Sequence, residues 1–378
     1  MLGASSPKHI ASGPAWGGPA LGPESPPWEI EMSRSTPVWA AFDAQAERLD
    51  QRFAGCFNRH TFEYLQPVRL QKQVPARLRR PYATSVSYTA WGAADAPLLV
   101  CLGGVANTAM RFSFLAADLR ADFRVVCMDW LGRGHSGWLA DESEYTGATY
   151  LEQLRQLLAH LQRCGQPPGP VHLLGSSMGG SIAMALAARS PALVGRLVLN
   201  DVGPAMPAAR RRRRADTLAR HYVFRSPEDI HRRVGAAQKN DGPVSEEIRH
   251  FLAWHQTRWS EENAGRVYRH DPRAMTAYRG QVMAQSRHDQ WQDWAGVRCP
   301  VLLVHGLQSD ALLATTIARM RRALNPHAAL AVAHVPETGH TPLLSDRNQT
   351  HCIGGWLRGQ VLCEELSIPH AYPREAWR

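Results

Sequence analysis

The sequence predicts an α/β protein with a mostly parallel β-sheet, helices on both faces of that sheet and an inserted helical cap. Continuous apolar runs, typical of strands buried on both faces, alternate with amphipathic helical segments along much of the chain. The alternation stops between 204 and 297, where charged and aromatic residues replace the strand runs, and it resumes at 300. With 378 residues and a hydrophobic share of 44%, the chain has the composition of an ordinary globular protein.

Two segments precede the predicted sheet. Residues 1–37 are rich in Gly, Pro, Ala and Ser and have no periodic apolar face, so we expect a disordered tail or a mis-assigned start, with Met32 as an alternative first residue. This opening lacks the basic region and the continuous apolar region of a secretory signal. Residues 38–81 have only a weak helical pattern and are predicted to form an N-terminal extension.

The first part of the predicted core spans 82–203. An alternating strand ends at Gly92 and is followed by continuous apolar strands. The predicted strands lie at 84–92, 97–102, 123–129, 171–174 and 196–201. The predicted helices between them lie at 112–119, 150–161 and 181–188.

The second part of the predicted core spans 298–365 and follows the cap at 204–297. Buried strands are predicted at 300–306 and 329–335, and helices at 314–324 and 348–362. Residues 366–378 are expected to form a loose C-terminal tail. The cap contains many tyrosines and tryptophans, which suggests an apolar acyl or aryl group in the substrate, although tryptophan-rich segments more often serve packing than a pocket.

A short turn supplies a candidate nucleophile. The segment Gly175-Ser176-Ser177-Met178-Gly179 fits the G-x-S-x-G pattern, with Ser177 between an apolar strand and a helical segment. A serine on such a sharp turn has a strained backbone, and side chains two residues away on either side would collide with the crossing chain. The two glycines remove that collision and expose the Ser177 hydroxyl.

A serine nucleophile needs a base and an orienting acid, and both are expected just past the carboxyl ends of parallel strands. His340 follows the last predicted strand, and Asp310 lies shortly after the strand before it. The order Ser177, Asp310, His340 is the order expected for this type of triad. Asp201 also ends a strand and is the alternative acid, but we prefer Asp310 because Asp201 runs directly into the cap boundary.

The oxyanion formed by such a serine would be held by two backbone N–H groups. The predicted donors are Met178, which follows the nucleophile, and one residue of the first strand-to-helix loop. In that loop Val105 is the preferred donor and Gly104 the second candidate, because small neighbouring residues let the main chain approach a substrate oxygen.

The remaining ionisable residues predict no metal site, cofactor or nucleic-acid partner. The formal charge of +10 comes mostly from dispersed residues, and no apolar run reaches the about 20 residues of a membrane span. Seven scattered cysteines fit a reducing, cytoplasmic environment. His135, His172 and His305 are interpreted as structural. One dense basic run suggests a solvated helix face or a contact with an acidic partner: Arg210, Arg211, Arg212, Arg213 and Arg214.

Together these motifs resemble the α/β-hydrolase superfamily from about 82 to 362, in particular bacterial serine esterase-like members with a helical cap. The resemblance implies a nucleophile, acid and base at Ser177, Asp310 and His340, and needs no cofactor. The loop begins Gly103-Gly104, where the family commonly has His-Gly, so the identity of the donor is open.

The leading functional hypothesis is hydrolysis of carboxylic esters through an acyl-enzyme, with lactones and polyester oligomers among the candidate substrates. Hydrolysis of carbon–carbon bonds in aromatic meta-cleavage products is an alternative, and so is acyl transfer or perhydrolysis, because a triad does not specify the acceptor. A non-catalytic binding protein on a hydrolase fold is the alternative from another class. The oligomeric state is open.

Overall fold

A computed structural model describes residues 37–238, 241–285 and 288–371. The predicted disordered tail at 1–37, including the alternative start at Met32, therefore lies almost entirely outside the described residues. Residues 372–378 of the predicted C-terminal tail also lie outside them.

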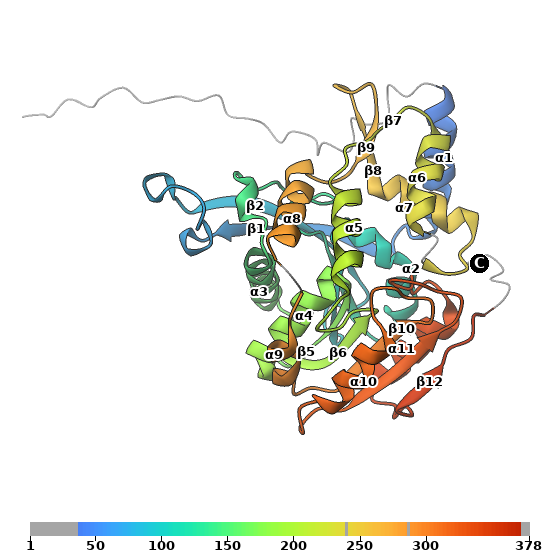
Figure 1. Cartoon of the computed structure of the whole chain (residues 1–378). Helices are drawn as coiled ribbons and strands as arrows, with labels where there is room; N and C mark the ends of the chain where they lie inside the picture. Colours follow the sequence, from blue (N-terminus) through green and yellow to red (C-terminus); the bar gives the residue numbers. More distant parts are fainter. Residues whose placement is uncertain (1–36, 239–240, 286–287, 372–378) are drawn as a thin grey trace, which may run out of the picture. The chain divides into compact units, whose positions relative to one another are not determined.

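A large sheet forms the centre of the described chain (Figure 1). Within the described residues it has nine strands in the order β1-β2-β4-β3-β5-β6-β10-β11-β12. All neighbours from β4 to β12 pair in parallel, whereas β1 and β2 are antiparallel. The predicted mostly parallel sheet is thus confirmed. The strands are β1 (Phe57–Gln66), β2 (Tyr82–Trp91), β3 (Leu98–Leu102), β4 (Arg124–Met128), β5 (Val171–Ser176), β6 (Val194–Asn200), β10 (Val301–Gly306), β11 (Leu330–Val335) and β12 (Glu365–Ser367).

Helices cover both faces of this sheet because successive strand side chains point to opposite sides, and both sides are apolar. In β3, Leu98, Val100 and Leu102 pack in one core cluster, which includes residues of the helices α3, α4, α9 and α10. Leu99 and Cys101 pack in the other cluster, with residues of α2 and α11. These helices are α2 (Ser113–Leu119), α3 (Gly147–Arg163), α4 (Met178–Arg189), α9 (Trp291–Gly296), α10 (Ala314–Arg322) and α11 (Arg347–Leu357).

The segment between β6 and β10, predicted as a helical cap, is mainly helical but also contains three short strands. Its strands form a small antiparallel sheet in the order β7-β9-β8. These strands are too short to give a recognisable apolar run. Trp294 of α9 belongs to the core cluster on the large sheet, so the end of the segment packs as core. Its other elements are α5 (Ala208–Leu218), β7 (Val223–Phe224), α6 (Pro227–Gln238), α7 (Glu246–Gln256), β8 (Thr257–Ser260), β9 (Gly265–Tyr268) and α8 (Pro272–Ala284).

The predicted N-terminal extension at 38–81 is partly an element of the sheet. Strand β1 pairs with β2 along its whole length, from Phe57 opposite Trp91 to Gln66 opposite Tyr82. It was missed because an edge strand with one solvated face has no continuous apolar run. The helix before it, α1 (Pro37–Arg52), packs against the inserted segment: Trp39 and Phe42 share a core cluster with Phe224.

The C-terminal segment also differs from the prediction. Strand β12 pairs with β11 in parallel, and Ile368 is buried beside it. The predicted tail at 366–378 therefore begins inside a strand. Three residues of strand between polar loops carry no periodic signal that could be read from the sequence.

Candidate active site

Ser177 occupies the sharp turn between β5 and α4. Its backbone angles are φ 50° and ψ −116°, a conformation that non-glycine residues rarely adopt. A Cβ on Gly175 would lie 2.4 Å from the Gly180 Cα, and a Cβ on Gly179 would lie 2.1 Å from the Leu102 carbonyl oxygen. The turn therefore has the geometry that the glycine spacing predicts, and only glycine fits at these two positions.

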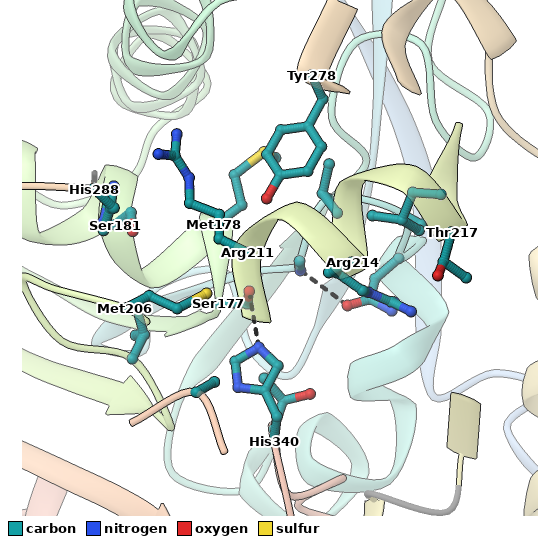
Figure 2. A pocket seen from close by; sticks show the side chains of 18 of the residues that line it. Ser177, Met178, Ser181, Met206, Arg211, Arg214, Thr217, Tyr278, His288 and His340 are labelled. Atoms are coloured by element: carbon teal, nitrogen blue, oxygen red, sulfur yellow. Dashed lines mark hydrogen bonds between the residues drawn. The ribbon is translucent and has the colours of Figure 1, made fainter. Parts of the chain in front are cut away.

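The Ser177 hydroxyl faces His340, as Figure 2 shows. The distance from Ser177 Oγ to His340 Nε2 is 3.2 Å. On the other side of the ring, His340 Nδ1 lies 2.9 Å from Asp201 Oδ2. With the imidazole proton on Nδ1, the ring donates to Asp201 and accepts from Ser177. The three side chains form one continuous hydrogen-bonded line.

The carboxylate of Asp201 is fully buried and held from two further directions. Its Oδ1 accepts from the Gly306 N–H at 3.1 Å, and its Oδ2 accepts from the Ser309 hydroxyl at 2.6 Å. Strands β6 and β10 are parallel neighbours, with Asn200 opposite Val304, so the residues that follow each strand meet. Ser309 is a site residue that was not predicted, and its only signal in the sequence is a hydroxyl residue close after a strand.

The preference for Asp310 as the partner of His340 is a correction that the structure requires. The Asp310 side chain is 60% exposed and its Oδ1 lies 2.6 Å from Arg210 Nε, with Arg213 nearby. Asp201, the alternative acid, contacts the histidine instead. The chain turns sharply at Asp201, with φ 51°, and this turn aims its carboxylate at the ring. The proximity of a cap boundary does not reveal such a turn.

The loop after β3 lies beside the nucleophile. A Cβ on Gly104 would come within 3.6 Å of the Ser177 Cβ. The Gly104 N–H already donates to Asn107 Oδ1 at 2.9 Å, which disfavours the second oxyanion candidate. Among the described residues, no partner accepts from the N–H groups of Val105 or Met178. Both amides are therefore available to a ligand.

Two buried side chains fix the shape of this loop. Trp130 Nε1 donates to the Gly103 carbonyl at 2.8 Å, and Arg133 Nε donates to the Val105 carbonyl at 2.9 Å. Both side chains are buried. These two hydrogen bonds, to the carbonyls of Gly103 and Val105, preorganise the loop in addition to its glycines.

A cavity of about 880 Å³ opens above Ser177 and His340, between the large sheet and the inserted segment. Its lining includes tyrosines but no tryptophan, so of the two roles considered for the tryptophan-rich segment the structure favours packing. Trp254 instead donates to Asp43, and Trp294 lies in the core. The tyrosines in the cavity wall are Tyr145, Tyr150, Tyr222, Tyr268 and Tyr278.

The five consecutive arginines divide between the cavity and solvent. Arg210, Arg211 and Arg214 line the cavity, because Arg214 lies four residues after Arg210 and three after Arg211, and such positions share a helix face. Arg212 and Arg213 are exposed. The expectation of a solvated face is therefore correct for only two of the five.

The three histidines interpreted as structural do not contact Ser177. Burial lowers the pKa of all three rings, to about 2 for His135. His305 Nε2 lies 3.1 Å from the Leu312 carbonyl and His305 Nδ1 lies 3.0 Å from His334. His305 is buried, whereas His135 and His172 are partly buried.

Metal ligands, membrane-spanning helices and disulfides are further features to consider in the described residues. These residues contain no group of three or more His, Cys, Asp or Glu side chains arranged to bind a metal ion. No helix in the part of the chain that the structure describes is both long and apolar enough to cross a bilayer. All seven cysteines are free thiols.

Comparison with known families identifies the class of protein. A family model described as the alpha/beta hydrolase fold matches residues 96–346, which is well over half of the chain. The chain therefore belongs to the α/β-hydrolase family. The predicted fold family, and the enzyme class it defines, are confirmed.

Relatives within this family narrow the comparison. A 3-hydroxybutyrate-oligomer hydrolase of Cupriavidus necator is 32% identical over 291 residues, covering 73% of this chain and 92% of the relative. An esterase of Mycobacterium tuberculosis is 34% identical over 127 residues, covering 34% of this chain and 40% of the esterase. An alpha/beta hydrolase structure from Novosphingobium aromaticivorans superposes with a TM-score of 0.63 at 25% identity, covering 79% and 98% of the two chains.

Proposed function

We propose that this protein hydrolyses carboxylic esters, with Ser177 as nucleophile, His340 as base and Asp201 as acid. The observation that carries the proposal is the continuous line from Ser177 Oγ through His340 to the buried Asp201 carboxylate. Hydroxyl, imidazole and carboxylate in this order have the geometry of a serine hydrolase triad. Oligomers of short hydroxy acids are the proposed substrate class, supported by the relative that aligns over 92% of its length.

The first half of the reaction forms an acyl-enzyme. Ser177 Oγ attacks the ester carbonyl carbon while its proton passes to His340 Nε2. The N–H groups of Val105 and Met178 donate to the oxyanion of the tetrahedral intermediate. Asp201 accepts from His340 Nδ1 and stabilises the imidazolium. The intermediate then collapses, the bond to the alcohol oxygen breaks, and His340 gives its proton to the departing alcohol.

The second half repeats these steps with water. His340 takes a proton from a water molecule, whose oxygen attacks the acyl carbon and forms a second tetrahedral intermediate. Collapse of this intermediate breaks the bond to Ser177 Oγ, which recovers its proton from His340. The products are a carboxylic acid and an alcohol, and no cofactor takes part.

Substitution of the nucleophile tests the proposal. Ser177→Ala is expected to lower kcat for p-nitrophenyl butyrate by about 10⁴-fold or more, because the acyl-enzyme cannot form. It should also abolish labelling by a fluorophosphonate probe, as read by mass spectrometry. Ser190→Ala, at the far end of the same helix, is the matched control and should keep both turnover and labelling. Undiminished turnover or labelling in Ser177→Ala would contradict the assignment.

A reducing, cytoplasmic location is a further proposal. Its support is the set of seven free thiols scattered through the fold, since secreted proteins usually pair their cysteines. Cys101 and Cys127 are fully buried and pack as small apolar residues.

A further inference from the structure

The cavity above Ser177 is rich in arginine, and most of these side chains already have partners. Eight arginines and four aspartates line it. Arg111 pairs with Asp241 at 2.9 Å, both side chains being buried, and Arg133 donates to main-chain carbonyls. The other paired arginines are Arg189 with Asp293, Arg210 with Asp310 and Arg232 with Asp229. Of the four aspartates of the wall, Asp241 and Asp293 are thus paired with arginines.

Arg214 differs from these residues. No described side chain or carbonyl accepts a hydrogen bond from its guanidinium, and no described carboxylate pairs with it. Burial lowers its pKa and the neighbouring Arg210 lowers it further, yet a guanidinium stays protonated at neutral pH. A partly buried cation without a partner carries a desolvation cost that an anion in the cavity would offset.

Neighbouring groups are suited to the same anion. Arg211, one turn earlier on α5, is held in place because its Nη2 donates to Gln285 Oε1 at 2.7 Å. Tyr268 and Tyr278 line the same cavity as Arg214. Burial raises the pKa of both phenols, so they are neutral hydrogen-bond donors near pH 7. Figure 2 shows Arg211, Arg214 and Tyr278 around the opening above Ser177 and His340.

We infer that Arg214 binds the free carboxylate of the substrate and thereby selects esters that carry an acid end. This inference rests on the proposed ester hydrolysis and deepens it. An oligomer of hydroxy acids has ester links along the chain and one free carboxylate at one end. A planar guanidinium binds such a group through two parallel hydrogen bonds. Held in this way, the oligomer presents a fixed ester link to Ser177, and its short length suits the enclosed cavity.

The charge of the acid end provides the test. The substrates are the dimer of 3-hydroxybutyrate as free acid and as its methyl ester, and cleavage of the internal ester is followed by chromatography. We expect the wild-type ratio of kcat/KM for free acid over methyl ester to be about thirtyfold or more. Arg214→Gln should bring this ratio close to one. Arg214→Met keeps the length of the stem and serves if the Gln variant does not fold.

Arg212→Gln is the matched control, because Arg212 lies on the same helix but faces solvent. It should keep both the activity and the ratio of the wild type. The inference is overturned if the wild type does not discriminate between the two dimers, or if both neutral Arg214 variants keep the full ratio. Uncharged p-nitrophenyl butyrate separates the two proposals. Its turnover without any preference for the free acid counts only against Arg214, whereas no turnover of any ester counts against the proposed function.

Discussion

The loops that follow β6 and β10 each carry an aspartate, and the two side chains lie in opposite environments. Asp201 has no exposed surface and accepts from a backbone amide, a hydroxyl and an imidazole. Asp310 is 60% exposed and pairs with Arg210 across the edge of the cavity. Asp201 directly follows Asn200 at the end of β6, and Asp310 lies shortly after Gly306 at the end of the neighbouring strand β10. Only the Asp201 carboxylate reaches His340.

This difference shows that a position after a strand is necessary for the acid that contacts His340, but that it does not decide which aspartate takes this role. A buried carboxylate keeps a fixed direction because every donor around it is part of the sheet or of its loops. An exposed carboxylate is screened by water and contributes little to a fixed geometry. The orientation of the backbone at Asp201, rather than its place in the chain order, aims the acid at the ring.

The largest predicted change in kcat distinguishes the two aspartates, which are substituted one at a time. Asp201→Asn is expected to lower kcat for p-nitrophenyl butyrate by about 10³–10⁴-fold, because an amide can neither fix the imidazole tautomer nor stabilise its charge. Asp310→Asn is the matched control and should change kcat by no more than about twofold, as expected for a screened surface charge. Equal losses in the two variants, or a larger loss in Asp310→Asn, would assign the role to the exposed carboxylate.

A smaller change in kcat is expected on removal of the Ser309 hydroxyl, which connects the loop after β10 with Asp201 in the loop after β6. Ser309→Ala removes the donor 2.6 Å from Asp201 Oδ2, and hydrogen bonds to charged groups contribute about 1.5–3 kcal/mol. We therefore expect kcat to fall by about tenfold with little change in KM, because Ser309 positions the acid without touching substrate. Steady-state kinetics measure this split.

Two variants distinguish positioning by Ser309 from a general structural role. Ser309→Thr keeps the hydroxyl and should recover most of the activity. In an Asp201→Asn background, Ser309→Ala should add little further loss, because the two residues act as one unit. Full additivity of the two losses would contradict the proposed link through Asp201.

The smallest effect concerns the ion pair at Asp310. A double-mutant cycle of Arg210→Gln and Asp310→Asn, measured by urea denaturation, should give a coupling free energy below about 1 kcal/mol, because Asp310 is solvated. This coupling should fall as salt is added. A value of several kcal/mol would mean that the exposed loop is held as firmly as the buried one.

Much of the fold was predictable because buried parallel strands give continuous apolar runs. The stretches at Leu98–Leu102, Arg124–Met128 and Val301–Gly306 are fully buried strands, as their sequences indicate. Strand β1 was missed because it alternates between a packed and a solvated face. The strands of the small sheet were missed because they contain only two to four residues each.

The candidate site was predictable to the extent that its signals are local. The glycines on either side of Ser177 predict the sharp turn. The structure leaves no room for a side chain at either glycine. His340 follows a recognisable strand, and the structure brings its ring to Ser177. Their catalytic roles remain proposals, which the variants above test.

The sequence by itself determined the buried parallel strands, the sharp turn and the two residues Ser177 and His340, because each depends on neighbours only a few positions away. The tertiary structure alone decided which aspartate meets the histidine and which arginines face the cavity. These choices depend on one backbone turn at Asp201 and on the packing of α5 over the sheet. Both bring together residues about 100 or more positions apart, such as Asp201 with Ser309 and His340.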